Sequence, residues 1–508
     1  MDSTLQLQSA SFMVYGHGNA WGAVWPELSL GCLALFLLVL ETVLPKSQHE
    51  RIPAVSVAGQ LAVLAVLLGR LDIPVTTAFN GLLILSSRGQ VMRVFFLLTS
   101  LFVSILAYAG LHRRRVPIVE FHHIVLVVTG ATMLLVESRN FVMLFVALET
   151  VTVGLYILVS YYRANPKTLE AGLKYLVMGA LSSALLLFGI ALLYGAAGGH
   201  GLPGRTDDAM EYAGLRGFLD ANPHNFLAAA GIALVLSGVA FKIGAVPFQI
   251  WIPDVYQGAP TPVTALLAVG SKAAGFIVLL VLVTEVFPSY EWLVGPVLTL
   301  MAAATLLFGN LAALKQRNVK RLIGLSGVSH AGFILLAVVS TCAAGAGAIG
   351  AVYFYLYAYL IGSFAVFGVM AVLSGPDDSV QELSDYAGLA KQSPFLAGVL
   401  ACGLGSLAGI PPFAGFLGKL YVFVAAFKAG HYGLLGIAAA GVVISIYYYF
   451  GWIRTAYFSD EAAISPETAA RAKSGPGFVL GITLALLVAA SILLGFCQGP
   501  LGVLMSGR

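Results

Sequence analysis

The stretch from Ala240 to Phe276 reads AFKIGAVPFQIWIPDVYQGAPTPVTALLAVGSKAAGF, and it decides how the rest of the chain is interpreted. It places Lys242 and Lys272 inside two apolar segments, with a run interrupted by proline and glycine between them. A helix in lipid normally excludes both features, because a buried ammonium loses its hydration and a proline removes a backbone donor that hydrocarbon cannot replace. Their coincidence predicts an internal polar path.

The composition indicates a membrane protein. The 508 residues are 59% hydrophobic and only 10% charged, whereas about 25% of the residues of a soluble domain are charged. There are about fourteen apolar stretches, each near the roughly 20 residues that a helix needs to cross a bilayer core. We therefore expect an all-α, polytopic membrane protein. One stretch is expected to begin near Met92, and another, 394–428, to be interrupted.

The positions of Lys and Arg predict the orientation. With the amino terminus outside, fifteen of the 27 basic residues fall in inner loops, eight in outer loops and four within apolar segments. Because inner loops carry the excess of basic residues, both termini are expected outside. Arg93 is counted here with the outer loops and Lys320 with the inner ones. The first 25 residues have no basic region before a short apolar core, so no cleaved signal peptide is expected.

Several kinds of site are not expected. The net charge of +4 comes from short basic clusters between apolar runs, which argues against nucleic acid as a partner. The cysteines are far apart and without neighbouring ligands, so they are interpreted as small core residues, and no metal, haem or iron–sulfur site is predicted. They are Cys32, Cys342, Cys402 and Cys497.

Two long connections, 195–223 and the acidic 375–393, are interpreted as surface loops or docking sites.

Ionisable residues lie inside several apolar segments. Glu149 is central in FVMLFVALETVTVGLYILV, where a carboxylate must be protonated, paired or wetted. Lys242 precedes the interrupted run, and Lys272 lies near the membrane midplane, about ten residues after Pro262. The alternative is a structural role. Glu149 would then be bonded to a neighbouring helix, and Lys174, about one turn inside its segment, would reach the inner interface.

Histidine adds two candidates. His330 follows GLSGVS in a helix expected to start near Lys320. It is interpreted either as a satisfied core residue or as a proton carrier, because its reference pKa is near neutrality. The pair His122–His123 is expected at the inner membrane boundary.

A proline-broken apolar helix with one lysine recurs in LGSLAGIPPFAGFLGKLYVFVAAF. Helix breaks are predicted at Pro247 and at Pro411 and Pro412, and such recurrence in two halves indicates paired transport units. The repeat is imperfect, because Lys242 precedes its proline by five residues whereas Lys419 follows Pro412 by seven.

Buried lysines and a buried glutamate suit proton movement. Burial disfavours the charged form of both side chains, so both can exchange protons near neutral pH, while proximity of the two stabilises both charges. A glutamate beside the first lysine of a chain therefore acts as a switch, since its withdrawal makes the lysine release its proton more readily. A sodium site would need several carboxylates or carbonyls at one place, and only Glu149 is interpreted as a well-buried carboxylate.

Four stretches carry a resemblance to a known family: ALETVTVGLYILV, the opening stretch, NVKRLIGLSGVSHAGF and AGIPPFAGFLGKLYVF. The chain resembles, over nearly its whole length, the antiporter-like membrane subunits of respiratory complex I, the proton-pumping NADH–quinone oxidoreductase. The resemblance implies two inverted five-helix repeats, each with one broken helix. The implied units are N-terminal helices in 1–118, the repeats in 119–288 and 289–456, and a loop and last helix in 457–508.

The resemblance also implies roles for residues. Glu149 looks like the family's ion-pair glutamate and Lys242 like its partner. Lys272 looks like the central connecting lysine, and Lys419 like the terminal exchange residue of the second half.

Lys174 and His330 are implied to belong to the same hydrated axis. The resemblance implies no cofactor in this chain, since NADH, FMN, iron–sulfur clusters and quinone would be bound by partner subunits. The implied partners are the other complex I membrane subunits, in a hetero-oligomer within the lipid of the bacterial inner membrane.

Two other functions stay open. The chain could be a component of a multi-subunit cation/proton antiporter, which shares this fold, or a scaffold that holds a membrane arm together. Sodium efflux without an electron donor favours the antiporter, whereas sodium-insensitive proton pumping tied to quinone reduction favours the oxidoreductase. Normal turnover and pumping after Lys242→Ala or Glu149→Ala would leave only the scaffold.

Overall fold

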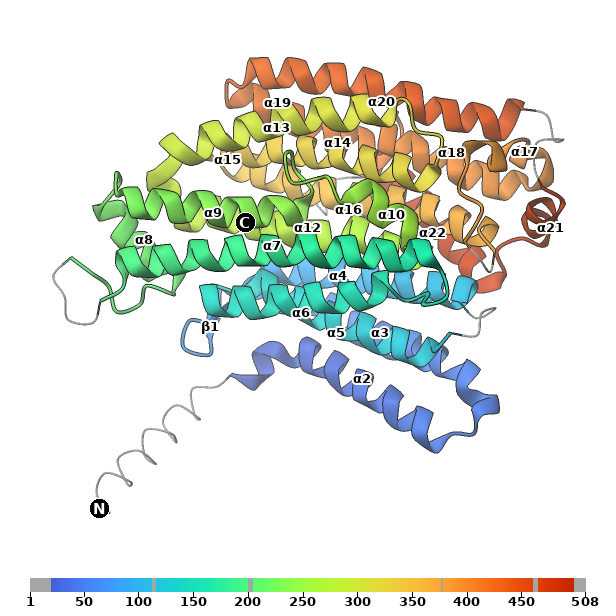
Figure 1. The fold of residues 1–508 in the computed structure, drawn as a ribbon, viewed down its shortest axis with the longest axis horizontal. Coiled ribbons are helices and arrows are strands. Elements are labelled where there is room, and N and C mark those ends of the chain that lie inside the picture. The colour runs from blue at the N-terminus through green and yellow to red at the C-terminus, as the bar shows by residue number, and fades with distance from the viewer. Residues whose placement is uncertain (1–19, 112–115, 200–203, 376–377, 460–464, 498–508) are drawn as a thin grey trace.

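The computed structural model describes residues 20–111, 116–199, 204–375, 378–459 and 465–497. Its long helices run nearly parallel, with α2 at one edge and α20 at the opposite edge (Figure 1). The long helices are α2 (Trp25–Val43), α3 (Ile52–Leu68), α4 (Ser87–Leu111), α5 (Ile118–Glu137), α6 (Phe141–Val159), α7 (Pro166–Ala197), α9 (Phe226–Ile243), α13 (Glu291–Ala313), α14 (Val319–Val339), α16 (Ala346–Leu373), α20 (Tyr432–Phe458) and α22 (Phe478–Phe496). A further span joins α11 (Thr261–Leu266), the π-helical turn η3 (Leu267–Ser271), α12 (Lys272–Val281) and the π-helical turn η4 (Leu282–Val286).

Within these residues, 13 helices are long and apolar enough to cross a membrane. The stretch at 394–428 is the remaining expected one, and it divides into two shorter helices, α18 (Pro394–Ala408) and α19 (Ala414–Lys428). In the described part of the chain the only strands are β1 (Thr76–Ala78) and β2 (Leu83–Leu85), which form one antiparallel hairpin. The predicted all-α, polytopic membrane fold is therefore confirmed.

The bundle has two distinct ends. The β-hairpin end, at the left of Figure 1, carries β1, β2 and α8 (Tyr212–Ala221). The α21 end, at the right, carries α17 (Leu389–Gln392) and α21 (Pro466–Ser474). The helix α15 (Thr341–Ala344) and the 3₁₀ turns complete the connections. Successive spans alternate in direction, so a residue near the end of a span lies at either the β-hairpin end or the α21 end of the bundle.

The two broken helices are built alike. The helix α9 stops at Ile243, Gly244 adopts a left-handed φ of 72°, and a short α10 (Ile252–Gly258) resumes the path. The helix α18 stops at Ala408, and Gly409 has a φ of 84°. Glycine occupies these caps because other residues reach the left-handed region only at a cost. The Val246–Pro247 and Pro411–Pro412 peptide bonds that follow are cis.

The two broken helices run in opposite directions, which explains the unequal offsets of their lysines. The helix α9 starts at the β-hairpin end, and α18 starts at the α21 end (Figure 1). Lys242 precedes its break, whereas Lys419 follows the other one on α19. Both lysines therefore lie on the half-helix nearer the β-hairpin end.

The structure corrects several expectations about charged residues and loops. Arg93, expected in an outer loop, lies in the second turn of α4, which begins at Ser87, and is buried against α2 and α5. Lys320, expected in an inner loop, is buried in the first turn of α14. The connection 375–393, expected to be a surface loop, carries the buried Asp378. His122, expected near the membrane boundary, lies close to the start of α5 and is fully buried against other helices, so its position along the span agrees with that expectation.

The cysteines were also interpreted wrongly as core residues. Cys32, Cys342 and Cys497 are exposed, and Cys402 is half-buried, so they face the outside of the bundle. In a protein that spans a membrane the outside is also apolar, and hydropathy alone does not separate it from the core.

The expectations about the termini concern residues 1–19 and 498–508, which lie outside the described residues.

Candidate proton path

Glu149 and Lys242 lie near each other in the first half, on α6 and α9. Half-buried Glu149 accepts a hydrogen bond from Ser183 Oγ of α7 at 2.5 Å through its Oε1 atom. Buried Lys242 donates to Thr152 Oγ1, which is three residues beyond Glu149 on α6 and so on the same helix face. The structure forms no direct ion pair between Glu149 and Lys242. The hydroxyl of Thr152 holds the ammonium instead.

Lys272 lies where the π-helical turn η3 passes into α12. It is buried, and its Nζ donates to the Gly327 carbonyl of α14 at 2.6 Å. The Nζ also lies 5.4 Å from the ring centroid of Tyr359 on α16. A Cβ added at Gly327 would lie 2.8 Å from this Nζ, so glycine provides the space for the ammonium.

His330 lies between two tyrosine hydroxyls in the second half. Its Nδ1 is 2.7 Å from Tyr355 Oη, and its Nε2 is 3.1 Å from Tyr449 Oη. A hydroxyl can donate or accept, so the ring is satisfied in either neutral tautomer and also when it is doubly protonated. The imidazole ring also lies 4.8 Å from the ring of Tyr359. Both sequence interpretations of His330 are compatible with this setting.

Lys419 binds the end of the broken helix. Its Nζ donates to the carbonyl of Ala408, the last residue of α18, at 2.7 Å. A small cavity of about 10 Å³ separates this lysine from His330, and its walls include Tyr355 and Ser406. That volume is close to what one water molecule needs, and the polar walls offer it partners.

These contacts join most of the predicted residues into one line. Lys272 and His330 both contact the ring of Tyr359, and the small cavity joins His330 to Lys419. On the other side, α12 packs against α9 at Gly275, where an added Cβ would lie 3.2 Å from the Cβ of Lys242. Gly275 is one turn beyond Lys272, so the first two lysines lie on facing helices.

Lys174 is the predicted residue that the structure does not bring into this line. Its side chain is 43% exposed and forms ion pairs with Glu170 at 2.8 Å and Asp254 at 2.7 Å. Asp254 also pairs with Arg321 at 2.6 Å. The hydrogen bond from Lys174, and then the one from Arg321, holds the pKa of Asp254 below its ordinary value. These residues form a charged group at the α21 end.

Sequence reasoning missed several polar residues. Asp378 accepts from Lys320 Nζ at 2.5 Å and from Thr261 Oγ1 at 2.8 Å, which ties the two halves together at the α21 end. Tyr355 and Tyr359 belong to the run FYLYAYL of α16, whose alternating tyrosines were the available signal. No pattern marked Asp378, because it lies in a polar connection whose burial depends on packing.

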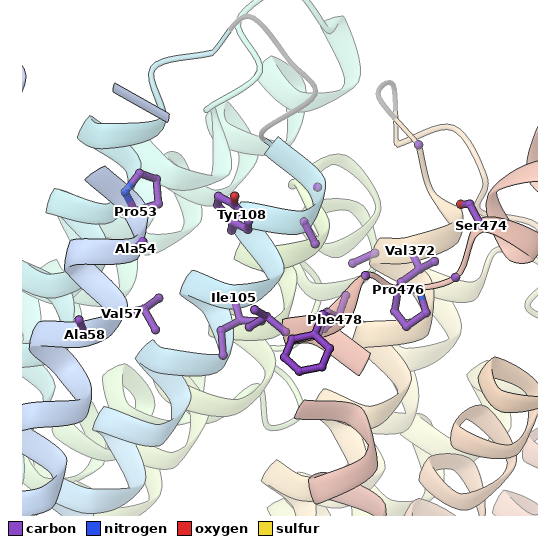
Figure 2. Close-up of a pocket in the computed structure, with 18 of the residues that line it drawn as sticks. Pro53, Ala54, Val57, Ala58, Ile105, Tyr108, Val372, Ser474, Pro476 and Phe478 are labelled. Atoms are coloured by element: carbon purple, nitrogen blue, oxygen red, sulfur yellow. The ribbon is translucent and has the colours of Figure 1, made fainter. Parts of the chain in front are cut away.

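A separate, apolar pocket lies away from this line. It has a volume of about 530 Å³ between α3, α4 and the turn before α22, and Figure 2 shows Val57, Ile105 and Phe478 around it. None of the residues of the line borders it. The described residues contain no group of three or more potential metal ligands.

A multi-pass membrane protein whose two broken helices deliver buried lysines to a polar line belongs to the class of ion-translocating membrane proteins. The model of the family described as "NADH:quinone oxidoreductase/Mrp antiporter, TM" matches residues 138–445. The chain belongs to this family. It is 62% identical over 502 residues to "NADH-quinone oxidoreductase subunit N 1" of Opitutus terrae, with 96% of this chain and 98% of the relative covered. It is therefore a homologue of subunit N.

Solved structures agree with this assignment. A chain of respiratory complex I from Thermus thermophilus with bound aureothin has a TM-score of 0.72 and 30% identity, with 95% of this chain and 100% of that chain covered. A chain of the Mrp complex from Dietzia sp. has a TM-score of 0.79 at 22% identity, with 96% of both chains covered. The second match shows a shared fold alone. Both solved proteins are multi-subunit complexes.

Proposed function

We propose that this chain is the proton-translocating subunit N of a respiratory NADH-quinone oxidoreductase, in which quinone reduction by other subunits drives proton movement here. The observation that carries the proposal is the line from Lys272 through Tyr359 and His330 to Lys419. A homologue at 62% identity over nearly the full length supports the choice of subunit. NADH, FMN, iron–sulfur clusters and quinone would be bound by partner subunits of the hetero-oligomer.

Each ionisable residue has a proposed role. Glu149 sets the charge near Lys242, and Lys242 passes a proton toward Lys272. His330 relays it to Lys419, which exchanges it in the second half. Supporting this order, neither Lys272 nor Lys419 pairs with a carboxylate of the described residues, and each instead donates to a carbonyl. A carbonyl accepts from an amine as well as from an ammonium, so the lysine keeps its contact when it releases its proton.

We also propose the arrangement of the chain in the membrane. The halves 119–288 and 289–456 act as inverted five-helix repeats, which the opposite directions of the two broken helices support. The protein lies in the bacterial inner membrane with the β-hairpin end outside. The basic residues near the helix ends and connections at the α21 end, among them Arg163, Lys167, Arg454 and Lys473, support this orientation.

The test is proton pumping by the purified complex in liposomes. Lys242→Ala and Lys419→Ala should lower the protons moved per quinone reduced, while Glu467→Gln, at an exposed ion pair of α21, should leave this ratio unchanged. Loss of one relay group lowers the rate of proton transfer by roughly 10²–10⁴-fold where that transfer is rate-limiting. Normal pumping by both lysine variants would refute the proposed path.

A cation/proton antiporter is the second candidate, because the Mrp fold covers 96% of this chain. The same liposomes separate the two functions. Sodium efflux driven by a pH gradient, without NADH or quinone, would favour the antiporter. Pumping that needs both redox substrates and ignores sodium would favour the oxidoreductase.

A further inference from the structure

A buried charge cluster lies at the β-hairpin end, outside the line of lysines. It joins Arg93 of α4, Glu27 of α2 and Glu137 of α5, whose side chains are 1%, 5% and 1% exposed. Arg93 Nε donates to Glu27 Oε1 at 2.8 Å and lies 3.7 Å from Glu137 Oε1. Its Nη2 donates to the carbonyl of Ala23 at 3.1 Å. The second carboxylate is thus near the guanidinium but not hydrogen-bonded to it.

The cluster has unused hydrogen-bonding atoms. Among the residues that the structure describes, buried Glu27 Oε2, Glu137 Oε1 and Arg93 Nη1 have no hydrogen-bond partner. Two carboxylates face one guanidinium, which leaves one excess negative charge in the interior when both are ionised. Such a charge is costly, and carboxylates that share one site normally share a proton. Binding one proton makes the cluster neutral and supplies the missing donor.

A surface pocket lies beside the cluster. It has a volume of about 660 Å³ and borders Gly89 and Val136, the neighbours of Glu137. A Cβ at Gly89 would collide with the Glu137 carboxylate, so that carboxylate lies directly behind the glycine in the pocket wall. The charged and titratable groups of the pocket are Asp72, Arg88, Arg139, Glu285 and Tyr353. Arg139 pairs with Glu285 at 2.7 Å.

We propose that Glu27, Arg93 and Glu137 form a second proton-binding site, which exchanges one proton with water in this pocket. The proton passes from a hydronium ion in the pocket to a carboxylate oxygen, so one O–H bond breaks, another forms and no electron moves. The inference rests on the proposed function, since such a site would serve the outer side of a proton-translocating subunit. It adds residues of α2, α4 and α5 to that function.

Infrared difference spectroscopy of the purified complex tests this proposal. The wild type should show the C=O band of a protonated carboxyl group at neutral pH, and transfer to D2O should shift the band. Glu137→Gln should remove the band, and Glu27→Gln should remove the same band, because either change leaves one carboxylate for one guanidinium. Glu467→Gln, at an exposed Glu–Arg pair, should leave the spectrum in this region unchanged.

Each other outcome would overturn the proposal. A band that neither glutamine variant removes belongs to another residue, and a band lost only in Glu137→Gln belongs to an isolated acid. If both variants fail to assemble, the wild type decides, because a protonated band that does not respond to D2O or to pH excludes exchange. The band does not depend on Lys242, so normal pumping by Lys242→Ala would refute the proposed function and leave this result unaffected.

Discussion

Lys272 and Lys419 each donate to a main-chain carbonyl, and that shared feature sets the chemistry of the line. A carbonyl offers a fixed dipole whose strength does not change with pH. The tyrosine hydroxyls around His330 can likewise donate or accept. A proton can therefore arrive or leave while the hydrogen-bonding partners of each group stay in place.

Gly409 cannot be replaced without cost, because its backbone conformation and the nearby Lys419 side chain both disfavour a side chain at this position. It has a φ of 84°, and a Cβ there would lie 2.7 Å from Lys419 Cδ. Gly409→Ala should cost about 1–2 kcal/mol for the left-handed backbone and should displace Lys419 from the Ala408 carbonyl. We expect a lower melting temperature and weaker proton pumping, measured on the purified complex.

Gly433 of α20 provides the matched control. Nothing lies within 4 Å of a Cβ added there. Gly433→Ala should leave pumping unchanged, because alanine suits a helix better than glycine does. If Gly409→Ala behaved like this control, the assigned role of the cap would be wrong.

At the scale of elements, ionic contacts at the α21 end hold segments of the two halves together. Asp378 joins the connection after α16 to α11 and α14 through Thr261 and Lys320. Asp254 joins α10 to α7 and α14 through Lys174 and Arg321. These segments surround the first helix break, so the contacts fix the path of the chain there.

Asp378→Asn should strongly destabilise the fold. It removes the negative charge that faces the buried Lys320, and breaking a buried ion pair from one side costs about 3–5 kcal/mol. Backbone strain does not add to this, because Asp378 has a φ of 51° and asparagine tolerates that conformation. The melting temperature measures the effect. The double variant Lys320→Met/Asp378→Asn should recover part of the loss, and equal or greater destabilisation would contradict a charge-based explanation.

The Asp254 contacts should give a pH-dependent stabilisation. Because the ion pairs lower the pKa of Asp254 in the folded state, their stabilisation is present above the ordinary value of 3.8 and disappears as the pH falls through the lowered pKa. The difference in melting temperature between wild type and Asp254→Asn should be full at neutral pH and shrink below about pH 4. A difference that grows on acidification would have the wrong sign.

At the scale of the whole molecule, the two ends are predicted to face different compartments. On a background without native cysteines, Asp220→Cys at the β-hairpin end should react with a membrane-impermeant maleimide added to intact cells. Glu467→Cys at the α21 end should react only after the membrane is opened. The reverse pattern would invert the proposed orientation. Both original side chains are well exposed, at 50% and 83%, so access does not limit labelling.

The sequence alone was sufficient to predict the class of fold and most of the ionisable residues in the line of lysines. Apolar length predicts spans, because a bilayer imposes one thickness and one backbone solution. Lys242, Lys272 and Lys419 were found because a charge within an apolar segment is costly and therefore conspicuous. The two breaks were found because proline and glycine have local effects on the backbone.

Only the tertiary structure decided which polar residues near the helix ends are buried. Arg93, Glu137, Lys320 and Asp378 occupy positions where the sequence equally permits contact with headgroups or water. Packing of helices far apart in the chain removes that contact, and no local pattern encodes it. The structure likewise decided between the two interpretations of Lys174, which lies about one turn inside its segment and is exposed and paired at the α21 end. The burial of these polar side chains depends on which helices pack against them, and that packing is set only by the tertiary structure.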